Sequence, residues 1–175
     1  ELGLRGEVNF PAFEQALKGF SRYASGQDRL LVLIDYTKPS TEKRFYILDL
    51  LQKKLLLSTY VAHGRGSGDN YAVAFSNRPG SYQSSLGFFR TGDTYMGKNG
   101  YSLFLDGLEK GINDKARERA IVVHGANYAD PAVLKGQQRL GRSLGCPALP
   151  PDISKQVIDT IKGGVLLYIY GLNKA

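Results

Sequence analysis

Hydrophobic positions follow two different periods along this chain. Near its start, apolar residues recur at helical spacing: Phe13, Ala16, Leu17, Phe20 and Ala24. Asn9 is a suitable N-cap, and Pro11 fits the first turn of a helix. The pattern therefore predicts an amphipathic helix, and we assign residues 1–27 to an N-terminal helical segment.

Beyond that segment the pattern changes to short apolar or alternating runs rich in Val, Ile, Leu, Tyr and Phe. Such runs are typical of β-strands and cover residues 30–36, 44–50, 54–62, 71–75 and 120–124. Turn-forming clusters occupy residues 37–41, 64–70, 77–80 and 92–100. Short strands joined by polar turns, without helical crossovers, predict an antiparallel β-sandwich or barrel.

The last third of the chain adds helices at the edge of this sheet. Asp130-Pro131 is a suitable start for a short helix, and residues 152–162 have the spacing of an amphipathic helix. Gly163-Gly164 would end that helix before a final strand over residues 165–170. No repeat or linker divides residues 28–175, so we expect one mainly β (α+β) domain with flanking helices.

Composition fits a folded domain. The chain has 175 residues, of which 42% are hydrophobic, enough to form a core. No apolar run approaches the roughly 20 residues of a membrane-spanning helix, so we expect no integral membrane segment. The sequence begins at Glu1 rather than Met, which is compatible with a processed product whose secretion signal was removed, or with a trimmed chain.

The charge balance is basic, with a formal net charge of +7 and a pI near 9.5. Such a charge suits nucleic acid, an anionic envelope polymer or acidic lipid. However, Lys and Arg are scattered, as at residues 53–54 and 115–119, and no zinc-finger spacing or aromatic RNA-binding signature occurs. We therefore expect a solvated basic surface and no nucleic-acid partner.

Candidate chemistry lies between Ile121 and Pro147, in the motifs I-V-V-H-G and R-S-L-G-C-P. They contain the single cysteine, Cys146, and one of two histidines, His124. A thiol needs a base or a positive charge nearby to react as thiolate, and His124, at the end of a predicted strand, can supply it. The Gly145-Cys146-Pro147 turn would expose the thiol and align backbone N–H groups as an oxyanion hole.

Other readings of these residues remain open. Free cysteine is often simply buried, and a lone histidine is often structural. His63 precedes glycines at the end of a predicted strand, and we hold it as a binding or structural residue. His63, His124 and Cys146 could form a three-ligand zinc site, but short ligand pairs are missing, so we expect no metal. The loop at residues 64–68 lacks the ending of a P-loop, so we expect no nucleotide or other cofactor.

The combined motifs resemble the catalytic domain of the L,D-transpeptidase family, cysteine enzymes that remodel bacterial peptidoglycan. The resemblance rests on His124-Gly125, on the 22-residue step to Cys146 and on the S-x-G-C sequence starting at Ser143. Upstream motifs at residues 75–81, 84–89 and 95–103 are similar to a divergent transpeptidase-like branch. The resemblance covers most of residues 28–172.

The resemblance implies a mechanism. Cys146 would attack an L,D-peptide bond of a stem peptide with His124 as its base, and N–H groups around Gly145 would hold the oxyanion. The imidazole would be oriented by a backbone carbonyl, which maps to Gly125. Aminolysis of the thioester would cross-link two stems, whereas hydrolysis would trim one.

The sequence also departs from the commoner family motif, which has histidine at the position of Leu144 and arginine at that of Ala148. Arg142 or Arg90 could supply the missing charge, and either could instead be a surface residue. Further candidates for the oxyanion and substrate site are Ser143, Tyr128 and Ser85.

These observations predict an L,D-transpeptidase of the periplasm or the cell surface, acting on stem peptides as a monomer. The alternatives are an L,D-carboxypeptidase or endopeptidase, which would be a hydrolase rather than a transferase, and a non-catalytic wall-binding module.

Overall fold

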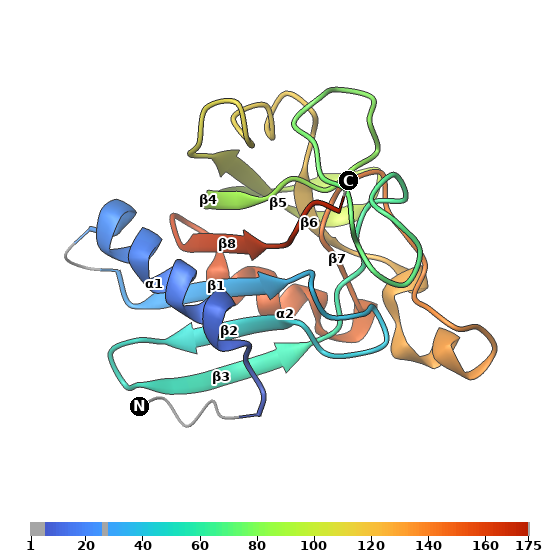
Figure 1. The fold of residues 1–175 in the computed structure, drawn as a ribbon, viewed down its shortest axis with the longest axis horizontal. Helices are drawn as coiled ribbons and strands as arrows, with labels where there is room; N and C mark the ends of the chain where they lie inside the picture. Colours follow the sequence, from blue (N-terminus) through green and yellow to red (C-terminus); the bar gives the residue numbers. More distant parts are fainter. Residues whose placement is uncertain (1–5, 26–27, 175) are drawn as a thin grey trace.

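The computed structural model describes residues 6–25 and 28–174. Residues 1–5 and 26–27 of the predicted N-terminal segment lie outside the described residues. Within the described residues, eight strands form one sheet in the order β3-β2-β1-β8-β4-β5-β6-β7 (Figure 1). The strands are β1 (Leu30–Asp35), β2 (Phe45–Asp49), β3 (Lys54–Thr59), β4 (Gly87–Gly97), β5 (Gly100–Gly107), β6 (Val122–Gly125), β7 (Ala148–Leu149) and β8 (Leu166–Tyr170). The helices are α1 (Phe10–Tyr23) and α2 (Pro151–Ile161), with short 3-10 helices η1 (Asn127–Ala129) and η2 (Pro131–Lys135).

The mainly β fold with flanking helices is confirmed, but the sheet is mixed rather than purely antiparallel. β1 pairs in parallel with β8, and β6 in parallel with β7. The sequence predicts antiparallel pairing because it shows no helical crossovers, and two parallel strands that follow each other along the chain need a crossover connection. β1 and β8 lie at opposite ends of the chain, so most of the domain serves as their connection.

The sheet curls until its two edges nearly meet. Beyond β3, Ala62 forms an isolated antiparallel bridge with Ala148 in β7, and Gly64 bridges Ser143 in parallel. Curling hides the open edges of the sheet, which would otherwise present unpaired backbone groups. The barrel-like closure also brings the segment around Cys146 against residues 62–64.

The two helices cover opposite faces of the sheet (Figure 1). Ala12 and Ala16 of α1 belong to a cluster with buried residues of β1, β2 and β8, whereas Val157, Ile158 and Ile161 of α2 belong to the larger cluster on the other face. A Cβ at Gly19 would lie 1.7 Å from the Phe88 ring, so glycine there lets α1 settle close to the sheet. Asn9 stands at the N-cap but makes no side-chain capping bond.

Two predicted elements were wrong. Residues 92–100, expected as a turn, belong mostly to β4, with the hairpin turn confined to residues 98–99. Gly92 lies where the β4–β5 register shifts, and glycine within a strand often marks such an irregularity. Residues 71–75, expected as a strand, form no ladder: Val73 N–H donates to Ser67 O at 2.8 Å. The other predicted strands and helices form, with ends shifted by a few residues.

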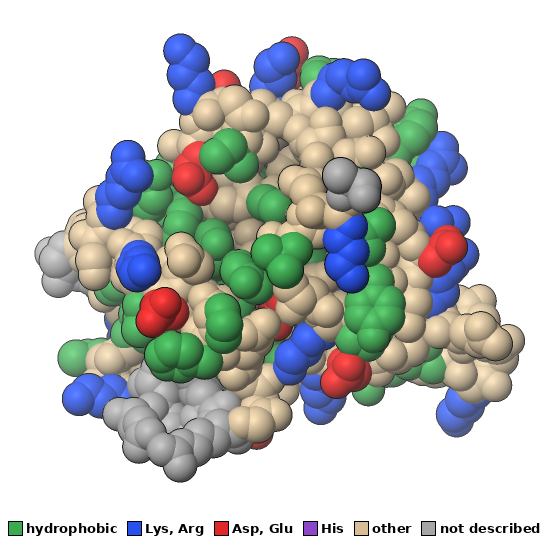
Figure 2. All heavy atoms as spheres, in the orientation of Figure 1, with side chains coloured by type: hydrophobic (Ala, Val, Ile, Leu, Met, Phe, Trp, Pro, Cys, Tyr) green, Lys and Arg blue, Asp and Glu red, His purple; other side chains and the backbone are tan. Residues whose placement is uncertain are grey.

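On the face of the molecule that Figure 2 shows, Lys and Arg side chains occur both around the rim and within the face, and hydrophobic side chains lie between them. Among the described residues, no helix is both long and apolar enough to cross a membrane.

Candidate active site

Cys146 and His124 line the same cavity, which has a volume of about 540 Å³. His124 lies in β6, whose partners are β5 and β7, so its backbone is fixed by pairing on both sides. Cys146 lies in the turn that leads into β7, directly beside β6. The structure therefore brings the two predicted reactive side chains to one opening.

A backbone carbonyl sets the tautomer of His124. Its Nδ1–H donates to the carbonyl of Gly125 at 2.9 Å, which leaves Nε2 as the acceptor. Burial lowers the pKa of His124, so the imidazole is neutral at neutral pH. Gly125 thus has the orienting position that the sequence resemblance assigned to it, and His124 has the protonation state of a base.

The thiol of Cys146 is half-buried and hydrogen-bonded to the start of β6. Its Sγ accepts a hydrogen bond from Val122 N–H at 3.4 Å and donates one to Ala120 O at 3.4 Å. Burial raises the pKa of Cys146, while the Val122 amide and the positive charges of Arg119 and Lys98 act in the opposite direction. The resting pair is therefore a neutral thiol and a neutral imidazole.

The turn before Cys146 is held by Ser143. The Ser143 hydroxyl donates to Cys146 O at 2.6 Å and accepts a hydrogen bond from Gly145 N–H at 3.1 Å. The Gly145 amide, expected in the oxyanion hole, is thus used within the turn. No acceptor is found for Cys146 N–H among the described residues, so this amide can point a donor at substrate.

Gly145 is required by its conformation and its neighbours. Its φ is +128°, a region that favours glycine, and a Cβ would lie 2.9 Å from Ile121 Cδ1 and 3.0 Å from Gln83 O. A glycine here allows the turn to press against two other segments.

Three further predicted residues, Ser143, Tyr128 and Arg142, line the cavity. Tyr128, in η1, has its pKa raised to about 12 by burial and by its proximity to Cys146. Arg142 lines the same cavity, and its guanidinium forms a salt bridge to Asp69 at 3.2 Å.

The structure does not bring Ser85 and Arg90 to the cavity lining. Ser85 is buried behind it, where its hydroxyl donates to Ser76 O at 2.8 Å. Arg90 lies in β4 and donates to Gly164 O at 2.8 Å and to Tyr23 O at the end of α1. Its guanidinium joins α1 to the sheet, so Arg90 is not the compensating charge considered from the sequence.

Sequence reasoning missed Arg119, which lines the cavity just before β6. The sequence alone shows Arg119 as one of several scattered basic residues, because its place at the cavity depends on which residues fold around it. Leu144, the residue before Gly145, is about half exposed at the same opening and offers an apolar contact.

His63 lies outside this cavity and serves the fold. It is buried, its Nδ1 accepts from Arg44 at 2.9 Å, and its Nε2–H donates to Gly68 O at 3.2 Å. Burial and the charge of Arg44 lower its pKa to about 4. Among the described residues, no three His, Cys, Asp or Glu side chains are grouped so as to hold a metal ion.

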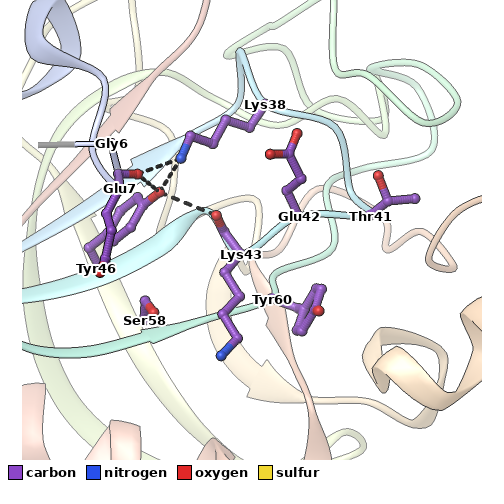
Figure 3. Close-up of a pocket in the computed structure, with 9 residues that line it drawn as sticks. All are labelled: Gly6, Glu7, Lys38, Thr41, Glu42, Lys43, Tyr46, Ser58 and Tyr60. Atoms are coloured by element: carbon purple, nitrogen blue, oxygen red, sulfur yellow. Dashed lines mark hydrogen bonds between the residues drawn. The ribbon is translucent and has the colours of Figure 1, made fainter.

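A second hollow of about 480 Å³ has a different character. Within it, Lys38 Nζ donates to Glu7 O at 2.5 Å and to Tyr46 Oη at 2.6 Å, and Tyr46 Oη donates to Glu7 O at 2.7 Å (Figure 3). These bonds fasten the segment before α1 to β2. In the part of the chain that the structure describes, no histidine or cysteine lines this hollow, so the Cys146 cavity is the stronger candidate site.

Two solved structures with TM-scores above 0.5 support the fold. The helical cell shape determining protein Pgp2 from Campylobacter jejuni aligns with a TM-score of 0.54 and 17% identity, over 85% of this chain and 50% of that structure. The structure of its K307A mutant aligns with a TM-score of 0.54 and 16% identity, over 95% of this chain and 58% of that structure. An L,D-transpeptidase from Mycobacterium smegmatis aligns with a TM-score of 0.49 and 13% identity, over 82% of this chain and 59% of that structure. The chain thus spans about half to three fifths of these structures.

The fold and the site define a curled β-sheet domain with a cysteine–histidine cavity. Residues 4–170 match the family model of the L,D-transpeptidase catalytic domain, and the chain therefore belongs to that family. The match begins before α1 and so extends over the helix that the sequence resemblance left out. Among curated proteins, no sequence matches this chain.

Proposed function

We propose that this chain is a cysteine L,D-transpeptidase that acts on peptidoglycan stem peptides through a thioester at Cys146. The observation that carries the proposal is the hydrogen bond of 2.9 Å from His124 Nδ1–H to Gly125 O, because it leaves Nε2 free to take a proton inside the cavity that Cys146 lines. Family membership supports the reaction class.

Acylation begins with transfer of the thiol proton from Cys146 to His124 Nε2. The sulfur attacks the carbonyl carbon of an L,D-peptide bond, and Cys146 N–H donates to the resulting oxyanion. The C–N bond then breaks, the imidazolium returns the proton to the leaving amine, and a thioester remains.

Deacylation decides between the two products. His124 accepts a proton from the attacking nucleophile, either the amine of a second stem or water, and Cys146 is released as thiol. Amine attack gives a cross-link and water attack gives a trimmed stem. Since peptidoglycan lies outside the cytoplasm, the proposal places the protein in the periplasm or at the cell surface.

Intact-protein mass spectrometry tests this function. Incubation with a disaccharide-tetrapeptide, or with a carbapenem as acyl donor, should add one acyl group to the wild-type protein and none to Cys146→Ala. Muropeptide products then separate transfer from hydrolysis. Wild-type protein that stays unmodified but sediments with sacculi would instead indicate a wall-binding module.

A further inference from the structure

Arg119 holds a fixed position behind the reactive turn. Its guanidinium donates four hydrogen bonds, to Ser76 O at 2.9 Å, Ser85 Oγ at 2.8 Å, Ser81 Oγ at 3.1 Å and Gln83 O at 2.8 Å. All four acceptors are uncharged. The bonds therefore fix the guanidinium without neutralising it, which is what a permanent local charge requires.

The fixed charge lies next to the nucleophile's turn. A Cβ at Gly145 would lie 3.4 Å from Arg119 Nη2, so the guanidinium packs against the residue before Cys146. The residue after Arg119, Ala120, accepts the hydrogen bond from Cys146 Sγ at 3.4 Å. The guanidinium and the sulfur thus share one small region of the cavity wall.

Neighbouring charged groups do not replace Arg119. Arg142 is paired with Asp69 at 3.2 Å, which offsets its charge. Lys98 is exposed at the tip of the β4–β5 hairpin, and no hydrogen bond from it is found among the described residues. His124 and Tyr128 face the cavity as neutral groups, and no Asp or Glu of residues 6–25 and 28–174 lines it.

We propose that Arg119 is a positioning residue that stabilises the thiolate of Cys146 through its fixed charge, and so favours sulfur attack in the proposed acyl transfer. When the thiol proton moves to His124 Nε2, the sulfur becomes negative close to a guanidinium that is already oriented. Arg119 forms no bond to substrate and transfers no proton. The inference deepens the proposed function and rests on Cys146 being its nucleophile.

Alkylation of the thiol measures this effect directly. Because the chain has one cysteine, the rate of iodoacetamide addition between pH 6 and 10, followed by intact mass, gives the pKa of Cys146 alone. Arg119→Gln should raise that pKa by about one unit, so alkylation well below the pKa slows about tenfold. Arg119→Lys keeps the charge and should stay within a factor of about three of wild type.

Arg117→Gln is the matched control, since Arg117 belongs to the same turn, forms a salt bridge to Asp106 at 2.6 Å and does not line the cavity. In Arg117→Gln the pKa of Cys146 should equal that in the wild-type protein. Equal shifts in Arg119→Gln and Arg119→Lys would indicate a purely structural role and overturn the proposal, as would an unchanged pKa in Arg119→Gln.

Two precautions keep the test decisive. If Arg119→Gln does not fold, the Arg119→Lys variant alone decides. A rise of a full unit in the pKa of Cys146 in this variant, which retains the charge, would overturn the electrostatic role of Arg119. Alkylation needs no wall peptide, so failure of the Arg119 role is distinct from failure of the proposed function, which would be shown by a wild-type protein that forms no acyl adduct.

Discussion

His124 combines two local features that suit the proposed role of a base. Its Nδ1–H is occupied by Gly125 O, and burial lowers the pKa of its imidazole. A histidine in this state accepts a proton on Nε2 and releases it again without a large free-energy cost. In the proposed reaction the thiol of Cys146, whose pKa burial raises, then depends on proton transfer to His124 rather than on a standing thiolate.

This state of His124 predicts the pH dependence of acylation. The imidazole must be unprotonated to accept the thiol proton, so the rate should fall as pH drops through the pKa of His124. Because that pKa is lowered, the midpoint of the acid limb should lie below about 6.5. Acylation rates measured by intact mass from pH 4.5 to 8 give the midpoint, and one above 6.5 would contradict the argument.

Removal of the imidazole provides the control. His124→Ala should slow acylation about 10²- to 10⁴-fold and abolish this acid limb, while the melting temperature stays close to that of wild type. A parallel loss of melting temperature and activity would identify His124 as structural.

At the scale of elements, the turn from Ser143 to Cys146 connects the chemistry to the sheet. Ser143 closes the turn from both sides, and its backbone N–H donates to His63 O at 3.0 Å. The bridges at the sheet edge therefore fix the position of the Cys146 sulfur. Precise placement of a nucleophile usually depends on such supporting contacts.

Replacing Gly145 tests how strongly this turn is specified. Gly145→Ala would place a Cβ 2.9 Å from Ile121 Cδ1 on a backbone with φ +128°, so we expect a loss of about 1–3 kcal/mol in unfolding free energy and slower acylation. Gly136→Ala is the control, since its φ is −118° and no atom lies within 4 Å of its Cβ position. Urea unfolding compares the two; equal losses would mean that the turn is not constrained.

At the scale of the whole molecule, a nearly closed sheet encloses an unusual buried charge. Arg44 is fully buried, donates to Val61 O and His63 Nδ1, and lies over the Tyr36 ring with 4.8 Å between Cζ and the ring centroid. His63 in turn holds Gly68. This network joins the residue before β2 to the loop at residues 64–68, which packs against the turn that precedes Cys146.

The network predicts sensitivity of the fold to acid. The pKa of His63 is about 4 in the folded protein and 6.5 in the unfolded chain, so the unfolded chain binds the proton first. The contribution of His63 to the free energy of unfolding is therefore fully present above about pH 6.5. It is lost as pH falls toward 4, by up to about 3 kcal/mol. Urea unfolding at pH 7 and pH 4 measures the loss.

His63→Asn isolates this contribution from other titrating groups, because the amide oxygen can still accept from Arg44 but does not titrate. The variant should lose less stability than wild type between pH 7 and pH 4. An identical loss in both proteins would contradict the assignment.

The amino-acid sequence by itself determined the type of most elements and pointed to the proposed reactive pair. Alternation and helical spacing depend only on local order along the chain, so α1, α2 and most strands could be predicted from it. The His-Gly and S-x-G-C motifs likewise pointed to Cys146 and His124, although their roles remain proposals.

Only the tertiary structure decided which distant residues share the cavity. The parallel pairing of β1 with β8 and the bridge from Ala62 to Ala148 depend on contacts between segments far apart in sequence. Arg119 came to the cavity and Arg90 went to α1 for the same reason. The local pattern of residues determines which face of a helix or strand is apolar. Closure of the sheet determines which charged side chains from distant segments lie next to that element.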